Sequence, residues 1–468
     1  MTGLIERVYS NKYMVKAEDI AGDIPSDREI YKTAIEVAWP SALEAVLVQL
    51  ISSADLIMVG GLGAAAISAV GITTQPRLIL LAVIFSLNIG VTAVVARRKG
   101  EGNAEEANKL LRQSLIICGV LALILSALGI VFAEPMIIFA GAQSDVVGNA
   151  IIYFRIICLG NFFTSLSLTI NAAQRGAGNT KISMKTNVAA NLINLFFNYL
   201  LINGHFGFPA WGVTGAAVAT AIGNFTGLLL SLKSITFAHE FLHLKRGQSW
   251  KIEKNTIASI LNVSGSAFVE QVFMRVGFFT TSKLIASLGT VAYATHQICM
   301  NILTISFSFG DGLGIASSAM VGQSLGAKRG DIATIYGKSL QRISQTVGFL
   351  FVFVFILGRK FFVDLYTNDL AVIAAGVDIM LIIATTAPIQ MSNVVISGSL
   401  RGAGDTKFVA ITSFISIGIV RPLATWLFCY PLGFGLMGAW FAFATDQILR
   451  FVINYSRFLK GNWTKIEI

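Results

Sequence analysis

The sequence predicts an all-α polytopic membrane protein with twelve transmembrane helices in two six-helix lobes. Three observations support this fold class. Of the 468 residues, 54% are hydrophobic and 13% are charged, whereas soluble domains carry about 25% charged residues. Many apolar runs reach ~20 residues, the length that crosses the hydrocarbon of a bilayer as a helix. The two halves of the chain also repeat each other at a constant shift of 226 residues.

Each apolar run is expected to be a helix, because lipid offers no partner for free backbone N–H and C=O groups. The predicted spans are residues 34–59, 65–96, 112–133, 149–172, 185–204, 211–236, 257–282, 291–321, 336–357, 377–399, 408–430 and 434–458. Residues Met1–Glu29 lack the central apolar stretch of a cleaved signal peptide. The first span is therefore expected to direct insertion into the plasma membrane itself.

Basic residues concentrate in alternate loops between the predicted spans. These loops hold Arg97, Arg98 and Lys99, and at later positions Arg175 and Arg401. This distribution follows the positive-inside rule and predicts that both termini are cytoplasmic. It also accounts for the net charge of +10, so the lipid bilayer is an expected partner and nucleic acid is not.

The internal repeat defines the two lobes. Gln174–Lys181 reads QRGAGNTK and Leu400–Lys407 reads LRGAGDTK, and the same shift aligns Glu44 with Glu270. A constant register over most of a chain indicates two structurally equivalent halves. Six spans per lobe predict parallel lobes related by a pseudo-two-fold axis along the membrane normal. The predicted segments are a cytoplasmic amino-terminal segment 1–33, a lobe 34–236, a cytoplasmic loop 237–256, a lobe 257–458 and a cytoplasmic tail 459–468.

The sequence lacks the motifs of several other functional classes. The four cysteines, Cys118, Cys158, Cys299 and Cys429, lie inside predicted spans without metal-ligand spacing, so we expect core residues and no metal site. Glycine-rich stretches lack the spacing of a phosphate-binding loop, and no Ser-His-Asp set is apparent. The sequence therefore predicts neither an ATP-driven pump nor an enzyme, and it predicts no cofactor.

Five strings, in their order and spacing, resemble the signatures of the multidrug and toxic compound extrusion (MATE) family. They are Asp55–Gly63 (DLIMVGGLG), Arg175–Thr180 (RGAGNT), Asn194–Tyr199 (NLFFNY), Gly212–Ala217 (GVTGAA) and Ser399–Gly402 (SLRG). The resemblance extends from Tyr31 to Phe458. It implies a secondary active antiporter, functional as a monomer, that exports amphipathic, mostly cationic compounds in exchange for Na⁺ or H⁺.

Ionisable residues within the spans are functional candidates, because each costs about 2.5–3.5 kcal/mol at the bilayer centre. The candidates are Glu44, Asp55, Arg155, Glu270, Arg275, Asp311 and Arg421. Asp55 follows Glu44 by eleven residues, or three helical turns, so the two acids share a helix face.

The resemblance places Asp55 at the cation site of the amino-terminal lobe, with partners from the fifth and sixth helices. In this sequence those partners are Asn194, Asn198 and Thr220. The two asparagines are spaced i,i+4 and present both amides to one point. Their oxygens with a carboxylate suit a hard cation such as Na⁺, and the same carboxylate could carry a proton instead. The alternative is an aspartate that bonds only nearby backbone.

Glu270 matches an acidic position that the family has in the seventh helix. Because the repeat pairs it with Glu44, we expect the two carboxylates to oppose each other across the cleft between the lobes. There they would attract a cationic substrate and release it on protonation. The alternative is that Glu270 pairs with Arg275, five positions along, although four is the favourable spacing.

This sequence departs from the family at one acidic position of the tenth helix, which is Gln390 here. An ion site in the carboxy-terminal lobe is therefore not expected. Gln390 would contact substrate as a neutral donor and acceptor, and Gln297, beside His296, could line the cavity. Packing is the alternative role for His296. Arg421, which precedes Pro422, is expected to neutralise an acid or backbone carbonyls.

Two rival functions, a flippase and a channel, are also open to this sequence. A flippase of a lipid-linked precursor, from the same broad superfamily, would require a deep cationic cavity, whereas the clearest cavity candidates here are acids. A channel is the second rival. The expected single site between two lobes favours alternating access over a channel.

Overall fold

The computed structural model describes residues 9–144, 146–237, 240–245 and 247–467 of the chain. The predicted segments 1–33, 237–256 and 459–468 therefore extend partly outside the described residues. Within the described residues the structure is almost entirely α-helical, without β-strands. The all-α fold class is confirmed.

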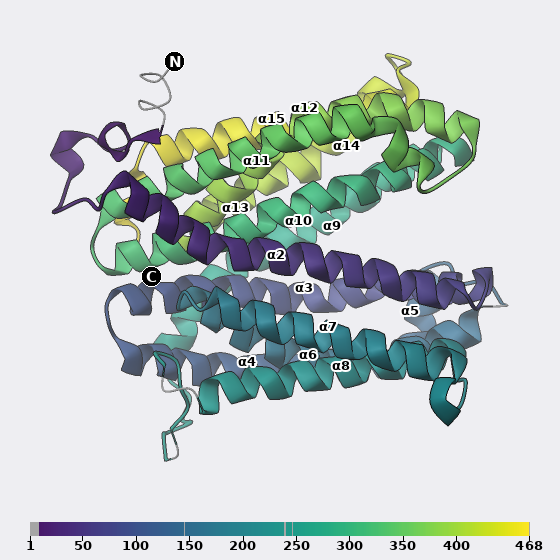
Figure 1. Cartoon of the computed structure of the whole chain (residues 1–468), viewed down its shortest axis with the longest axis horizontal. Coiled ribbons are helices and arrows are strands. Elements are labelled where there is room, and N and C mark those ends of the chain that lie inside the picture. The colour runs from purple at the N-terminus through teal and green to yellow at the C-terminus, as the bar shows by residue number, and fades with distance from the viewer. Residues whose placement is uncertain (1–8, 145, 238–239, 246, 468) are drawn as a thin grey trace. The chain divides into compact units, whose positions relative to one another are not determined.

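The long helices follow the predicted spans in order (Figure 1). Their bounds are α2 Asp27–Gly60, α3 Ala64–Gly100, α4 Ala104–Val131, α6 Val147–Gly176, α7 Thr180–Asn203, α8 Gly212–Thr236, α9 Lys254–Ala286, α10 Thr290–Gly326, α11 Gly330–Asp364, α12 Leu370–Gly402 and α15 Gly435–Leu459. The eleventh predicted span comprises α13 Thr406–Ser413, the π-helix η4 Phe414–Val420 and α14 Arg421–Cys429. The short α5 Ala133–Phe139 follows α4, and 3-10 turns occur at Asn11–Tyr13, Ala17–Asp19, His205–Gly207 and Asn462–Lys465.

Among the described residues, eleven helical stretches are long and apolar enough to cross a membrane. The fifth predicted span, α7, falls outside these eleven. Its polarity comes from the asparagines Asn187, Asn191, Asn194 and Asn198, which lower its mean hydropathy. The helix that is least apolar is therefore the one that contributes most of the amides to the candidate site.

The chain divides into two compact units. Unit N comprises Leu43–Phe268, and unit C comprises Met1–Ala42 together with Val269–Ile468. The unit boundaries fall inside the long helices α2 and α9, whereas the predicted boundary between the lobes is the polar loop 237–256. The first part of α2 belongs to unit C because Ala34 and Ala38 pack there against Leu313 and Met391.

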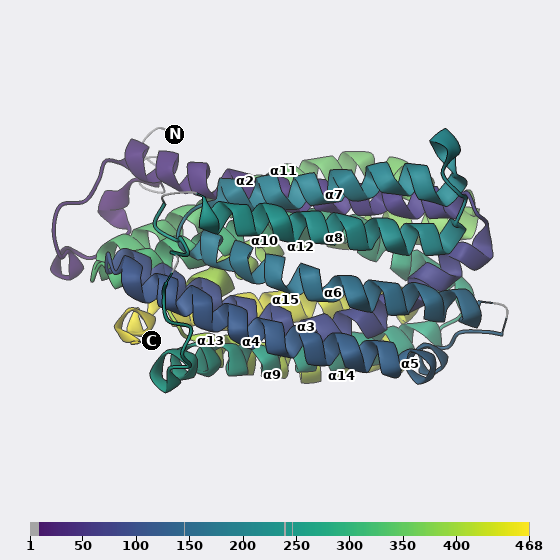
Figure 2. The same ribbon diagram turned by 90° about the horizontal axis from the view of Figure 1, so that it is seen from below.

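In unit N, α6 packs against α3, α4 and α8, and α7 packs along α8 (Figures 1 and 2). Its apolar core includes Ile137, Phe154 and Cys158. In unit C, α12 packs against α10, α11 and α15, and α14 packs against α15. The four cysteines of the chain are buried with free thiols, as expected for small core residues.

The repeated Arg-Gly-Ala-Gly motif forms the same tight turn in each unit. Its second glycines, Gly178 and Gly404, both have φ of +89°, a left-handed conformation that favours glycine. Its first glycine permits a close helix contact, since a Cβ at Gly176 would lie 2.6 Å from the carbonyl oxygen of Thr92. Gly402 meets the carbonyl oxygen of Ser318 in the same way, and Thr92 and Ser318 are themselves 226 residues apart.

Candidate functional site

Asp55 lies on α2 of unit N and points toward two amides of α7. Asn198 donates a hydrogen bond from Nδ2 to Asp55 Oδ1 over 2.8 Å. Asp55 is half-buried, while Asn194 and Asn198 are buried. The structure therefore brings the predicted aspartate and both predicted asparagines together, and the alternative of contacts with nearby backbone alone is not what it shows.

The hydrogen-bond network sets the orientation of the Asn194 amide. With its nitrogen toward Asp55, Asn194 donates to Oδ2 over 2.8 Å and its oxygen accepts from Thr220 Oγ1 over 3.2 Å. A carboxylate only accepts, so this orientation satisfies both groups. The predicted partner Thr220 of α8 thus joins the cluster. Gly223 allows the close approach of α8, because a Cβ there would lie 2.7 Å from Asn194 Cβ.

The cluster offers oxygen atoms to a cation. Asn198 Oδ1 is buried and has no hydrogen-bond partner in the described structure, so it is free to coordinate beside the Asp55 carboxylate. The Asn194 oxygen is occupied by its hydrogen bond from Thr220, so the oxygens left for a hard cation are those of the Asp55 carboxylate and Asn198 Oδ1. Among the described residues no lysine or arginine forms an ion pair with Asp55, so its charge is not neutralised by the protein.

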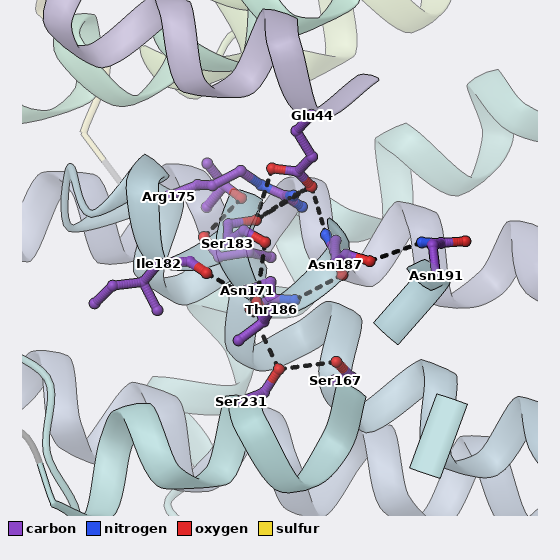
Figure 3. A network of polar contacts seen from close by, with 12 residues as sticks. Glu44, Ser167, Asn171, Arg175, Ile182, Ser183, Thr186, Asn187, Asn191 and Ser231 are labelled. Atoms are coloured by element: carbon purple, nitrogen blue, oxygen red, sulfur yellow. Dashed lines mark hydrogen bonds and ion pairs between the residues drawn. The ribbon is translucent and has the colours of Figure 1, made fainter. Parts of the chain in front are cut away.

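Glu44 has a different environment three turns earlier on α2. Its side chain, 8% exposed, reaches α6 and α7 (Figure 3). Arg175 Nη1 lies 3.4 Å from Glu44 Oε1. Ser183 donates to Oε2 over 3.1 Å, and Asn187 donates to Oε1. Glu44 is therefore a buried, arginine-paired carboxylate.

The network around Glu44 continues into the interior of unit N. Asn187 accepts a hydrogen bond from Asn171, whose oxygen in turn accepts from Thr186 and Ser231 (Figure 3). Ser231 also bonds Ser167. Such a connected network holds the Glu44 carboxylate in one position.

Glu270 of unit C has equivalent partners. Only 2% of it is exposed, Arg401 Nη2 lies 2.6 Å from its Oε1, and Ser413 Oγ donates to the same oxygen over 2.9 Å. Arg401 is the repeat equivalent of Arg175, and Ser413 is that of Asn187. The alternative pairing with Arg275 is wrong, because Arg401 takes that place.

These pairs change the expectation for the two glutamates. Arg175 and Arg401 were assigned to cytoplasmic loops, but they lie in the last turns of α6 and α12 and reach back to buried acids. Because each carboxylate is already neutralised, a cationic substrate would have to displace an arginine. The repeat in the sequence could have indicated these pairs, because a glutamate and an arginine recur in each half at the same separation of 131 residues.

The remaining predicted substrate contacts, Gln390 and Gln297, lie in unit C. Gln390 is buried and its Oε1 has no partner in the described structure, whereas Gln297 is exposed and donates to Tyr293 over 3.3 Å. No hydrogen bond between described residues joins Glu270, Gln297 and Gln390.

Arg421 neutralises an acid, as expected. Its partner is Asp446 of α15, with Arg421 Nε 3.1 Å from Oδ2. Arg450 binds the same oxygen over 3.1 Å, and Ser416 donates to Oδ1. The list of candidate ionisable residues omitted Asp446, although it lies inside the twelfth predicted span and the same criterion would have found it.

Comparison with known proteins agrees with this architecture. A family model described as MatE matches residues 40–200 and 266–427. A probable multidrug resistance protein NorM of Thermotoga maritima is 29% identical over 443 residues, covering 93% of this chain and 94% of the relative. The multidrug resistance protein NorM of Vibrio cholerae is 26% identical over 421 residues, covering 87% and 91%.

Solved structures share the fold at low identity. The Vibrio cholerae MATE transporter VcmN in its bent form aligns with a TM-score of 0.83 and 19% identity over 93% of this chain and 97% of that one. A MOP superfamily transporter from Pyrococcus furiosus aligns with a TM-score of 0.87 and 18% identity over 94% and 97%. The match covers both halves of the chain in each case.

Proposed function

Because this chain belongs to the MatE family of multidrug efflux transporters, we propose that it is a secondary active exporter of amphipathic, mostly cationic compounds. It exchanges them for Na⁺ or H⁺ by alternating access, in the plasma membrane, with both termini cytoplasmic. The names of its relatives, which are multidrug resistance proteins, support drugs as the cargo, and its long apolar helices support the multi-pass topology.

The observation that carries this proposal is the unneutralised carboxylate of Asp55 among uncharged amide groups. Glu44, Glu270 and Asp446 each have an arginine partner, and Asp55 has two asparagine amides instead. A carboxylate without a counter-ion is costly inside a membrane protein. Binding of a cation or proton removes that cost, so occupancy of this site is suited to driving a conformational change of unit N.

In this mechanism the residues of the site have separate roles. Asp55 supplies the charge, Asn198 Oδ1 supplies a free ligand oxygen, and Asn194 with Thr220 holds the second carboxylate oxygen in place. Na⁺ would be coordinated by these oxygens, whereas H⁺ would reside on the carboxylate. Substrate release would follow when the cation neutralises Asp55 and shifts the equilibrium between the two access states.

A cationic substrate would bind through Glu44 or Glu270 by replacing the guanidinium of Arg175 or Arg401. The same pairing disfavours the flippase alternative, because these two arginines are engaged with glutamates. Phosphate groups of a lipid-linked precursor would have to compete with a carboxylate for them.

Transport in proteoliposomes tests the proposal. Purified protein is reconstituted with ethidium, and Na⁺ and H⁺ gradients are imposed separately. We expect an inwardly directed gradient of one of the two ions to accelerate dye export, and dissipation of that gradient by a selective ionophore to stop it. Export that proceeds at the same rate without either gradient would overturn the proposed coupling.

A further inference from the structure

A small cavity lies within unit C at the position that corresponds to the candidate cation site of unit N. The repeat shift of 226 residues aligns Asp55 with Thr281 and Thr220 with Asp446. In unit C the acid is therefore on α15, the equivalent of α8, and not on α9, the equivalent of α2. Arg421 lies beside this acid, where unit N is proposed to bind an exchangeable cation. Unit C consequently carries its own fixed positive charge at this place.

The cavity measures about 30 Å³ and is lined by residues of α9, α10, α14 and α15. A site of this size holds two or three water molecules or a single monatomic ion, since one water needs roughly 10–15 Å³. Its polar lining residues are Thr281, His296, Arg421 and Trp440, and none of its nine described lining residues is acidic.

Three of the four polar lining residues have buried polar atoms without described partners. Trp440 Nε1 and Thr281 Oγ1 have no hydrogen-bond partner in the described structure, although Trp440 is 1% exposed and Thr281 is 8% exposed. His296 Nδ1 is also without a described partner. An indole N–H and a guanidinium donate only, so they would repel a cation and stabilise an anion. Buried donors of this kind cost free energy unless something accepts from them.

The charge balance points to the same occupant. Asp446 is the common partner of Arg421 and Arg450, so this cluster of three ionised side chains carries one excess positive charge. Arg421 is 3% exposed and packs over the rings of Phe278 at 4.9 Å and Phe443 at 5.1 Å. Its guanidinium is therefore fixed beside the cavity and shielded from water.

The backbone leading to Arg421 is also unusual. The π-helix Phe414–Val420 ends immediately before it, and π-turns within helices occur frequently at functional sites. The equivalent stretch of unit N lies inside the regular α-helix α7.

From these observations we propose that unit C binds a halide ion, such as chloride, between Thr281, Trp440 and Arg421. The anion accepts the hydrogen bonds of the threonine and the indole and balances the excess charge of the cluster. It thereby connects α9 and α15 through a bound ion. This inference concerns the unit that lacks the proposed coupling site, so it stands or fails independently of ion-coupled export.

Thermal unfolding of the full chain in detergent tests this site. Melting is compared in sodium chloride, sodium bromide and sodium gluconate at equal sodium concentration and ionic strength. We expect saturable stabilisation by the halides over gluconate. Thr281→Val and Trp440→Phe should each weaken the apparent halide affinity about tenfold, the loss of one hydrogen bond to a charged group.

Matched controls exist beside both residues. Thr280 is exposed and bonds its own helix at Val276, and Trp426 is 52% exposed, so Thr280→Val and Trp426→Phe should leave the halide response unchanged. Thr281→Val preserves side-chain shape and keeps the test decisive if Trp440→Phe fails to fold. Equal melting in halide and gluconate, or a halide response that both cavity variants retain, would overturn the proposal.

Crystals grown in sodium bromide provide the direct measurement. We expect an anomalous scattering peak within hydrogen-bonding distance of Thr281 Oγ1 and Trp440 Nε1. Density there without an anomalous signal would identify ordered water and contradict halide binding.

Discussion

Asn198 of α7 donates a hydrogen bond to Asp55 of α2, and Asn187 of α7 donates one to Glu44 of α2. Both contacts join residues 143 positions apart, so α2 and α7 run parallel with two polar contacts eleven residues, or about 16 Å, apart. Arg175 neutralises the carboxylate of Glu44, whereas Asp55 has no basic partner among the described residues. This difference is the basis for proposing that the Asp55 contact, and not the Glu44 contact, binds the coupling ion.

Asp55→Asn should abolish ion-coupled dye export while the protein still inserts. The amide keeps the size of the side chain but removes the charge that binds the driving cation. Export of ethidium from cells, corrected for the amount of protein in the membrane, measures the effect. Asp364→Asn, at the exposed end of α11, is the matched control and should export normally. Export by Asp55→Asn at the wild-type rate would remove Asp55 from the mechanism.

Asn198→Ala should lower the apparent affinity for the driving ion about tenfold, because it removes a hydrogen bond to a charged group and a free ligand oxygen. The initial rate of dye export in proteoliposomes at increasing ion concentration gives this value. Asn191→Ala is the control on the same helix, since Asn191 bonds only the Asn187 carbonyl over 2.8 Å among the contacts described. Equal ion dependence of the two variants would contradict a role for Asn198 in the site.

Glu270→Gln should weaken the export of cationic dyes selectively and lower the free energy of unfolding by about 2 kcal/mol. The half-buried Arg401 loses its charged partner, which costs roughly this amount. Transport kinetics and denaturation in mixed micelles measure the two effects. Unchanged export kinetics would assign Glu270 to structure alone.

A double variant separates these two roles of Glu270. Glu270→Gln with Arg401→Gln should recover most of the lost stability, because replacing both members of a buried ion pair is much less costly than removing one. Export of cationic dyes should stay impaired. If the double variant also recovers export, the carboxylate acts only through Arg401.

Gly402→Ala should destabilise unit C by about 2 kcal/mol, since the new methyl group meets the Ser318 carbonyl and overpacks the contact between α12 and α10. Gly404→Ala should cost about 1–2 kcal/mol because of its left-handed backbone. Gly265→Ala, where nothing lies within 4 Å, should be neutral or slightly stabilising. Denaturation in mixed micelles compares the three, and equal stability of all would refute this account of the repeated turn.

The spans followed from the apolar runs of the sequence, and the cluster around Asp55 followed from the resemblance to the MATE family. Apolar length determined the helices, and the i,i+4 spacing of Asn194 and Asn198 placed both amides on one face of α7. The sequence was not sufficient for Arg175 and Arg401, because the positive-inside rule accounts for their charge without a partner. Their role depends on which buried acid the last helical turn reaches, and that is set by tertiary packing.

Asp446 was not among the predicted ionisable candidates for a different reason. Its charge inside a span was visible in the sequence, but its pairing with Arg421, the residue that directly follows the π-helix, depends on tertiary packing. Backbone irregularities of this kind have no simple periodic signal, so the cavity beside Arg421 emerged only from the structure.

The asparagine-rich face of α7 also affects how the chain is made. A helix with four amides on a lipid-exposed surface would partition poorly into a bilayer by itself, so α7 gains a stable membrane position only with α2 and α8 beside it. During synthesis, α7 is therefore expected to be stable in the membrane only after α8 has emerged from the ribosome. A nascent chain that stops after Asn203 is expected to leave α7 outside the membrane and to be degraded.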